Sequence, residues 1–191
     1  MKRRRLVPTV AVVLGSLVLA VTGAWAGFPN ILRFGDPELV AGDAATADEL
    51  RVASATTTAL LDPRVLVEDI VVVGIQEGVQ TRLTAPFEAV YVCVNGGENV
   101  PSAANKTVLA GELESSALFP AAKNGRATGS LLTQALPSAA EAAAATGFAC
   151  PAGQVLEFDR VVFSGLVLSV DGGESIPLDT TLASPSVHGV S

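Results

Sequence analysis

The segment FEAVYVCVN, Phe87 to Asn95, is the most informative part of the chain for its fold, because it is apolar on both faces when it is arranged as a strand. Successive side chains of a strand point to opposite faces of the sheet. One face carries Phe87, Ala89, Tyr91 and Cys93, and the other carries Val90, Val92 and Val94. Two apolar faces indicate a strand that is covered on both sides, so we expect this segment inside a sheet.

The segments around this strand are also rich in β-branched residues and are separated by proline and glycine. Further strands are predicted at Val52–Leu60, Val65–Ile75, Leu109–Phe119, Ala127–Ala135, Gln154–Val170 and Ser175–Leu182. A bulge or bend at Ser164-Gly165 is expected to interrupt the longest of them. About eight short strands with almost no helix predict an all-β fold, an antiparallel β-sandwich that is immunoglobulin-like or jelly-roll-like.

Turn and cap residues set expectations for the connections. Asn124-Gly125, within Lys123–Arg126, predicts a hairpin between Leu109–Phe119 and the strand that follows. A capping box begins at Ser138 and a glycine follows the alanine run at Gly147, so one short helix is expected before Cys150.

The rest of the chain divides into shorter regions around the β-sandwich domain, residues 51–183. Residues 27–50 are expected to be irregular, with at most a short helix that begins at Asp36-Pro37-Glu38. Residues 184–191 are expected to form a flexible C-terminal tail, because Ser, Pro, Gly and Val dominate it.

Residues 1–26 are typical of a secretory signal peptide. A basic start is followed by the apolar run Leu6–Thr22 and by Ala24-Trp25-Ala26, so cleavage is predicted between Ala26 and Gly27. The alternative is an uncleaved membrane anchor, because the apolar run approaches a bilayer-spanning length. The compact three-part pattern favours cleavage, which would leave a freely secreted protein with no stable membrane span. Sec and twin-arginine export both remain open.

Cleavage would make the remaining chain strongly acidic. Four of the 12 basic residues lie in the signal, and all 19 acidic residues lie outside it. Such a surface is a poor partner for nucleic acid or anionic membranes, because binding to them rests on clustered Lys and Arg. The only tryptophan, Trp25, is also removed, which disfavours a sugar-binding face built on stacked aromatic rings.

Cys93 and Cys150 are the only cysteines. An even number in an exported chain favours one disulfide, since oxidising compartments form and keep such bonds. A metal-binding pair and a reactive thiol are the alternatives, and neither is supported by nearby histidines.

The sequence contains no constellation typical of an enzyme, so no catalytic, cofactor-binding or metal-binding residues are predicted. The only histidine, His188, lies in the expected tail. Two carboxylate pairs, Glu112/Glu114 and Glu157/Asp159, could be acid/base pairs, but residues two apart on a strand fit a solvated sheet face better.

Two short motifs also have simple alternatives. Asp171-Gly172-Gly173-Glu174 could supply weak calcium ligands, although a plain hairpin turn is favoured. Asn105-Lys106-Thr107 matches a glycosylation sequon, which is interpreted as a coincidence of common residues.

Several strings together resemble a group of small secreted actinobacterial proteins with two cysteines. They are YVCVNGG at Tyr91–Gly97, Pro101, Ala104-Asn105-Lys106, Asn124-Gly125 and FACPAGQ at Phe148–Gln154. The resemblance covers Leu50–Val170, and it implies that Cys93 pairs with Cys150. It implies no reaction. The segment Asn124–Thr133 is also similar to immunoglobulin-like carriers of the neocarzinostatin type, although those have two disulfides.

These observations predict a noncatalytic secreted β-domain with a structural or interaction role at the cell envelope or in the medium, where its partner is an unidentified protein. The first alternative is an extracellular carrier of a small apolar ligand, because several strands have two apolar faces. The second is a secreted protease inhibitor that uses the segment Val94–Lys106.

Overall fold

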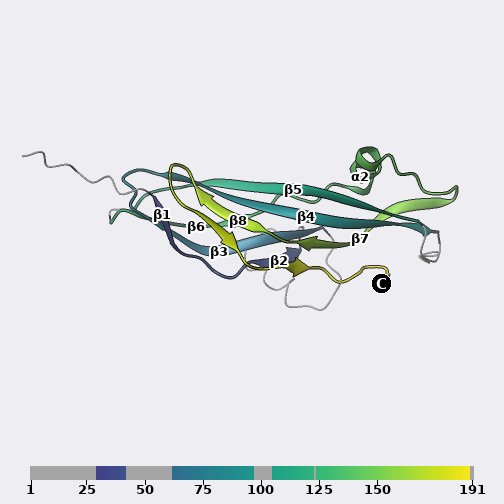
Figure 1. The fold of residues 1–191 in the computed structure, drawn as a ribbon, viewed down its shortest axis with the longest axis horizontal. Coiled ribbons are helices and arrows are strands. Elements are labelled where there is room, and N and C mark those ends of the chain that lie inside the picture. The colour runs from purple at the N-terminus through teal and green to yellow at the C-terminus, as the bar shows by residue number, and fades with distance from the viewer. Residues whose placement is uncertain (1–28, 42–61, 97–104, 123, 190–191) are drawn as a thin grey trace, which may run out of the picture.

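The computed structural model describes residues 29–41, 62–96, 105–122 and 124–189, and these residues form an all-β sandwich with one short helix. The strands lie roughly along the long axis of the molecule (Figure 1). Two antiparallel sheets contain ten described strands, which confirms the predicted fold class. The predicted strand at Val52–Leu60 lies outside the described residues.

The smaller sheet, sheet A, is built around β3 (Pro63–Val73). On one side of β3 lie β1 (Asn30–Arg33) and β2 (Glu38–Ala41), which pair with opposite ends of it. On its other side lies β6 (Arg126–Leu132).

Two of these strands correct the sequence-based expectation for residues 27–50. Residues 30–33 and 38–41 are strands, and Asp36-Pro37-Glu38 leads into β2 where a helix was predicted. The capping signal is local, whereas the free edge of β3 offers a ladder of backbone hydrogen bonds that favours extended chain.

The larger sheet, sheet B, is built around β4 (Val79–Asn95). β5 (Lys106–Phe119) pairs with β4 over its full length on one side. On the other side lie β7 (Gln154–Phe163) and β8 (Leu166–Val170), which follow one another along β4 with a break at Ser164-Gly165. β9 (Ser175–Leu178) and β10 (Leu182–Ala183) complete this side. The predicted break and the turn at Asp171–Glu174 are therefore confirmed.

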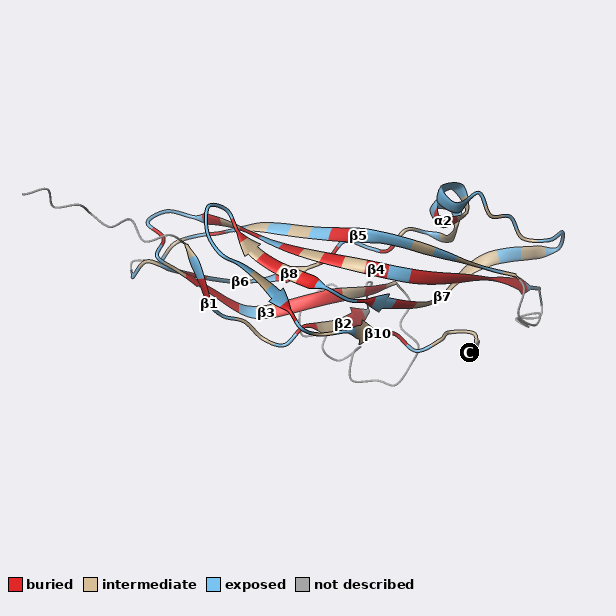
Figure 2. Ribbon diagram, viewed as in Figure 1, coloured by how far each residue is buried: buried red, intermediate tan, exposed pale blue. Residues whose placement is uncertain are grey.

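The main core lies between the two sheets, and β4 contributes alternate residues to it (Figure 2). These include Leu83, Phe87 and Tyr91, which belong to the same core cluster as Val65, Val67 and Ile70 of β3. Val90, Val92 and Val94 form a second, smaller buried cluster on the opposite face. The prediction of an interior strand with two buried faces is confirmed over residues 89–94.

The predicted Asn-Gly hairpin is wrong. Gly125 does form a turn, with φ of +70° and a backbone hydrogen bond of 3.0 Å to the Ala122 carbonyl. However, β5 pairs with β4 in sheet B and β6 pairs with β3 in sheet A. The chain crosses between the sheets, and the ring of Phe119 packs against Gly129, where an added Cβ would lie 2.4 Å from it. Packing of apolar faces therefore overrides the local hairpin signal.

The predicted helix is confirmed as α2 (Ala139–Thr146). Ser138 and Glu141 form a reciprocal capping box, and Gly147 ends the helix with φ of +66°. Ala142 is fully buried against the main core, so α2 covers one end of the sandwich.

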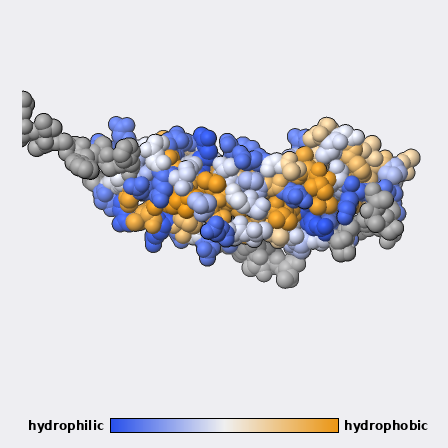
Figure 3. Space-filling model, viewed as in Figure 1, coloured by the Kyte–Doolittle hydropathy of each residue, from blue (hydrophilic) through white to orange (hydrophobic). Residues whose placement is uncertain are grey.

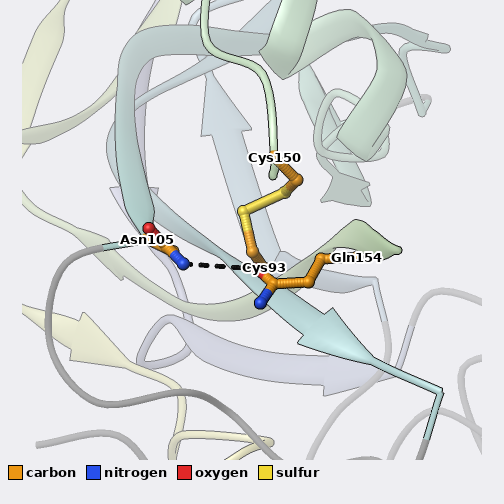
Figure 4. Close-up of a disulfide and its surroundings, with 4 residues drawn as sticks. All are labelled: Cys93, Asn105, Cys150 and Gln154. Carbon is orange, nitrogen blue, oxygen red and sulfur yellow. Dashed lines mark hydrogen bonds between the residues drawn. A yellow bond between two sulfur atoms is a disulfide. The ribbon is translucent and has the colours of Figure 1, made fainter. Parts of the chain in front are cut away.

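The disulfide between Cys93 and Cys150 is also confirmed, with 5.7 Å between the two Cα atoms (Figure 4). It ties the segment after α2 to the central strand of sheet B. Beside it, the Asn105 amide donates a hydrogen bond of 3.3 Å to Gln154 Oε1. The asparagine of the sequon therefore has a structural contact at this end of the sheet.

Candidate functional site

A recess lies between β5 and α2, and we call it the β5–α2 groove. It encloses about 620 Å³. It is lined by residues of β4, β5, the 134–137 segment and α2: Phe87, Leu109, Ala110, Gly111, Glu112, Leu113, Gln134, Ala135, Leu136, Pro137, Glu141 and Ala145. Figure 3 shows α2 as a weakly hydrophobic surface, because alanine makes up most of the helix.

One wall of the groove is the edge of a strand. In the described residues β4 is the strand that pairs with β5, so the opposite edge of β5 is unpaired. Five consecutive residues, Leu109 to Leu113, line the groove. Alternate side chains of a strand point to opposite faces, so a groove on one face of β5 would be lined by every second residue. The unbroken run of five residues therefore indicates that the groove runs along the backbone edge of β5.

The direction of the backbone groups follows from one hydrogen bond. The Cys93 N–H donates to the Asn105 carbonyl at 2.8 Å, and these two residues stand directly opposite each other in the unbroken β4–β5 register. In an antiparallel pair, hydrogen-bonded positions alternate with positions whose backbone groups point the other way. The odd-numbered residues of β5 therefore bond to β4, and Ala110 and Glu112 direct their N–H and C=O groups to the free edge.

The floor of the groove is apolar because β5 has a glycine opposite a phenylalanine. Gly111 pairs with Phe87, and an added Cβ on Gly111 would lie 2.9 Å from the Phe87 ring. The ring therefore lies against bare backbone. Leu113 and Leu136 are also buried in the same core cluster, so the groove opens directly onto the interior of the sandwich.

The second wall, residues 133–138, is irregular and is held by hydrogen bonds to β3, to Asp62 just before β3 and to β4. The Thr133 N–H donates to the Val65 carbonyl at 2.9 Å, and Thr133 Oγ1 accepts from the Val65 N–H at 3.0 Å. The Leu136 N–H donates to Asp62 Oδ1 at 3.2 Å. The Tyr91 hydroxyl donates to the Pro137 carbonyl. The Tyr91 contact therefore joins the wall to β4, the strand that pairs with β5.

The charges at the groove are negative. Glu112 and Glu114 are exposed on the outer face of β5, and Glu141 lies on α2. Hydrogen bonds from the Ser138 side chain and backbone lower the pKa of Glu141, so this carboxylate stays ionised at neutral pH. None of the lining residues is Lys, Arg or His. Glu112 and Glu114 thus lie on a wet face, as predicted.

A smaller cavity of about 270 Å³ lies on the other side of the 134–137 segment. Tyr91 and Phe158 line it with their rings in an edge-on contact, together with Leu136, Pro137 and Asp62. Burial, with the nearby Glu141 and Asp62 charges, raises the pKa of Tyr91 to about 12.

The C-terminal segment corrects another expectation. Ser184 is buried and exchanges hydrogen bonds with Val161, and the Val187 N–H donates to the Asp159 carbonyl at 2.9 Å. The segment after β10 therefore makes hydrogen bonds along β7 from Ser184 to His188, contacts that the expectation of a free tail did not include. The local composition gave no sign of these distant backbone partners.

The interpretation of Glu157/Asp159 as a solvated pair is also wrong. Asp159 is an extra residue in β7 at a register shift and is fully buried. Its Oδ1 accepts from Ser186 Oγ at 2.5 Å and from the His188 N–H at 3.1 Å. His188 is 12% exposed, and its Nε2 lies 3.4 Å from Glu157 Oε2. The bulge turns Asp159 towards the C-terminal segment, which it anchors.

The other site residues considered from the sequence are not among the residues that line the groove. At the β8–β9 turn, Glu174 Oε2 accepts a hydrogen bond from the Ile31 N–H. The described residues contain no group of three or more His, Cys, Asp or Glu side chains that could hold a metal ion. No described helix is long and apolar enough to cross a membrane. Ala26, Gly27 and residues 97–104 of the inhibitor segment lie outside the described residues.

Comparisons with family models, curated proteins and solved structures find nothing that matches this chain. The groove itself was not predicted from the sequence. One usable signal was present: Gly111 interrupts a strand pattern, and such a glycine often marks a close backbone approach.

Proposed function

We propose that this protein is a noncatalytic secreted β-domain that binds another protein at the cell envelope or in the medium, with the β5–α2 groove as its binding surface. The observation that carries the proposal is an edge of β5 that pairs with no other described strand and faces a helix across an apolar floor. An exposed strand edge is a ready template for pairing with another chain.

The groups that line the groove suit recognition better than chemistry. They are apolar side chains, backbone groups and carboxylates, and they include no Ser, Cys, His or Lys that could act as a nucleophile. Binding sites combine such an apolar surface with a few polar groups that fix orientation. The chemical types of the lining side chains therefore support a noncatalytic role.

Secretion is supported by the disulfide, because such bonds persist in oxidising compartments. The signal pattern of residues 1–26 adds an independent sequence argument. Together they support the proposal of a partner outside the cytoplasm.

The proposal is tested by blocking the groove from α2. Ala145 is exposed and lines the groove, whereas its neighbour Ala144 is exposed and is not among the lining residues. Ala145→Trp should fill the groove, and Ala144→Trp is the matched control. Partners captured by the wild-type protein from envelope and culture fractions should be identified by mass spectrometry and retested as purified proteins. Loss of their binding in Ala145→Trp alone supports the proposal, and equal binding by both variants contradicts it.

A second candidate function is the extracellular carrier of a small apolar ligand, favoured by the aromatic cavity beside Tyr91 and Phe158. Native mass spectrometry of the protein purified from its producer tests this function. A bound mass that Phe158→Ala abolishes supports it, and a ligand-free spectrum contradicts it.

A further inference from the structure

We infer that the occupant of the β5–α2 groove is an extended polypeptide that adds as a strand to the free edge of β5 and alternates apolar with basic residues. This inference rests on the proposed function and names the chemistry of the partner. Strand addition next to a groove is one of the recurring modes of peptide recognition, in which backbone bonds give affinity and alternate side chains give specificity.

The backbone of β5 supplies the first requirement. Ala110 and Glu112 present their N–H and C=O groups to the groove, as the Cys93–Asn105 hydrogen bond and the register require. In the described residues these groups have no strand partner on that side. An extended peptide can pair with both residues, whereas a ligand without a repeating backbone cannot match their spacing.

The apolar floor supplies the second requirement. A residue of the added strand that lies opposite Gly111 would point to the inner face of the sheet, as the Gly111 position does. There it would meet the ring of Phe87 and the side chain of Leu136. Because glycine contributes no side chain at this point, the Phe87 ring lies against the backbone and offers an apolar contact to such a side chain of the peptide.

The outer face supplies the third requirement. Peptide residues opposite Glu112 and Glu114 would point outward beside these exposed carboxylates. In the described part of the chain, neither carboxylate forms an ion pair, and no lining residue is basic. Opposite charges in directly facing strand positions stabilise a pair, and like charges destabilise it. Lys or Arg at alternate positions of the peptide therefore completes the match.

The test uses a short, blocked peptide of alternating valine and lysine, with a valine and glutamate peptide of the same length as its control. Titration calorimetry should detect the lysine peptide and show binding at least about tenfold weaker for the glutamate peptide. Amide exchange measured by NMR should slow at Ala110 and Glu112 when the lysine peptide binds. Equal binding of the two peptides, or exchange that changes elsewhere only, would overturn the inference.

Proline variants test strand addition directly. Ala110→Pro removes an N–H that faces the groove and leaves the β4–β5 bonds in place. Ser116→Pro is the matched control. Ser116 is also an even-numbered residue of β5, so its N–H likewise points away from β4, but it does not line the groove. The first should weaken the lysine peptide about tenfold or more, and the second should change its affinity less than about twofold. An equal effect of both prolines contradicts the inference.

Charge reversal keeps the test valid if either proline disturbs folding. Glu112→Lys with Glu114→Lys should abolish binding of the lysine peptide and favour the glutamate peptide. Glu77→Lys with Asp179→Lys changes the same net charge at exposed positions away from the groove and should have little effect.

The two proposals can fail separately. If Ala145→Trp abolishes partner binding while Ala110→Pro and the charge reversal do not, the groove is a binding site but strand addition is wrong. If Ala145→Trp has no effect on partner binding, the proposed function itself fails. A dimer of this chain that forms through β5 and is lost in Ala110→Pro would also overturn the inferred occupant.

Discussion

The hydroxyl of Tyr91 donates a hydrogen bond to the backbone carbonyl of Pro137, and this contact links the central strand of sheet B to the segment that leads into α2. Tyr91 is fully buried and is the only tyrosine in the sequence. Both recesses at this end of the sandwich include Pro137 in their walls. The Tyr91–Pro137 contact therefore holds the candidate binding surface in place.

The ionisation of Tyr91 should be delayed in the folded protein. Its pKa is raised to about 12 from a value of 10.0, chiefly because burial disfavours the phenolate. Since the folded pKa lies above the unfolded one, the associated stability is complete below about pH 10 and is lost as the pH approaches 12. An ultraviolet absorbance titration follows this single tyrosine, and denaturant-unfolded protein is the control. A midpoint near 10 in the folded protein would contradict the prediction.

Loss of the Asp159 carboxylate should release the C-terminal segment. Asp159→Ala leaves the Ser186 hydroxyl and the His188 N–H without their buried acceptor. The free energy of unfolding should fall by about 2 kcal/mol. Denaturant unfolding measures the loss, and carboxypeptidase should digest residues 184–189 faster. Asp179→Ala, at an exposed position, is the control and should change neither. An intact segment in Asp159→Ala would show that other contacts hold it.

A methyl group at Gly129 should disturb the packing of the two sheets. The added Cβ in Gly129→Ala would lie 2.4 Å from the Phe119 ring, so the ring or the strand must move. Overpacking of this kind costs about 1–3 kcal/mol. Gly96→Ala is the matched control, because an added Cβ there meets nothing within 4 Å. Thermal unfolding compares the two, and equal melting temperatures would argue against tight packing at Gly129.

Removal of the disulfide should lower stability substantially. The bond closes a loop with a sequence separation of 57 residues. In the chain-entropy description a loop of that length is worth about 4 kcal/mol. Denaturant unfolding of a double variant, Cys93→Ala with Cys150→Ala, measures the loss against the oxidised wild type. A loss well below about 2 kcal/mol would indicate that the unfolded chain is already constrained at this end.

Export should remove residues 1–26. N-terminal sequencing of the protein from the culture medium is expected to begin at Gly27. Ala26→Leu should block cleavage, because the cleavage site requires small residues, and should leave the longer chain with the membrane fraction. Ala20→Leu, within the apolar run, is the control and should be processed normally. Recovery of the uncleaved wild-type chain in membranes would support the anchor alternative.

Features encoded in neighbouring residues could be predicted from the sequence alone. The strand with two buried faces at residues 89–94 follows from apolar side chains on both of its faces. The helix follows from the Ser138–Glu141 capping box and from Gly147. The break at Ser164-Gly165 likewise follows from a glycine in an extended segment. In each case the physical cause lies within a few residues of the chain.

Features that depend on distant partners could not be predicted in this way. The turn at Gly125 forms, but its flanking strands join different sheets because Phe119 packs on Gly129 across the sandwich. Residues 184–189 are ordered along β7 because Asp159 bulges towards them. Local composition carries no information about either contact.

An acidic all-β domain with an interior strand, a short capped helix and two cysteines could be predicted from the residues alone. The packed fold was needed to show that one edge of β5 pairs with no other described strand and that α2 faces this edge across Phe87 and Gly111. Apolar alternation and helix capping depend on side chains that are close together in the sequence. The backbone N–H and C=O groups that pair strands are the same at nearly every residue, so they do not specify a partner. Which edge is left free therefore depends on how the whole chain packs.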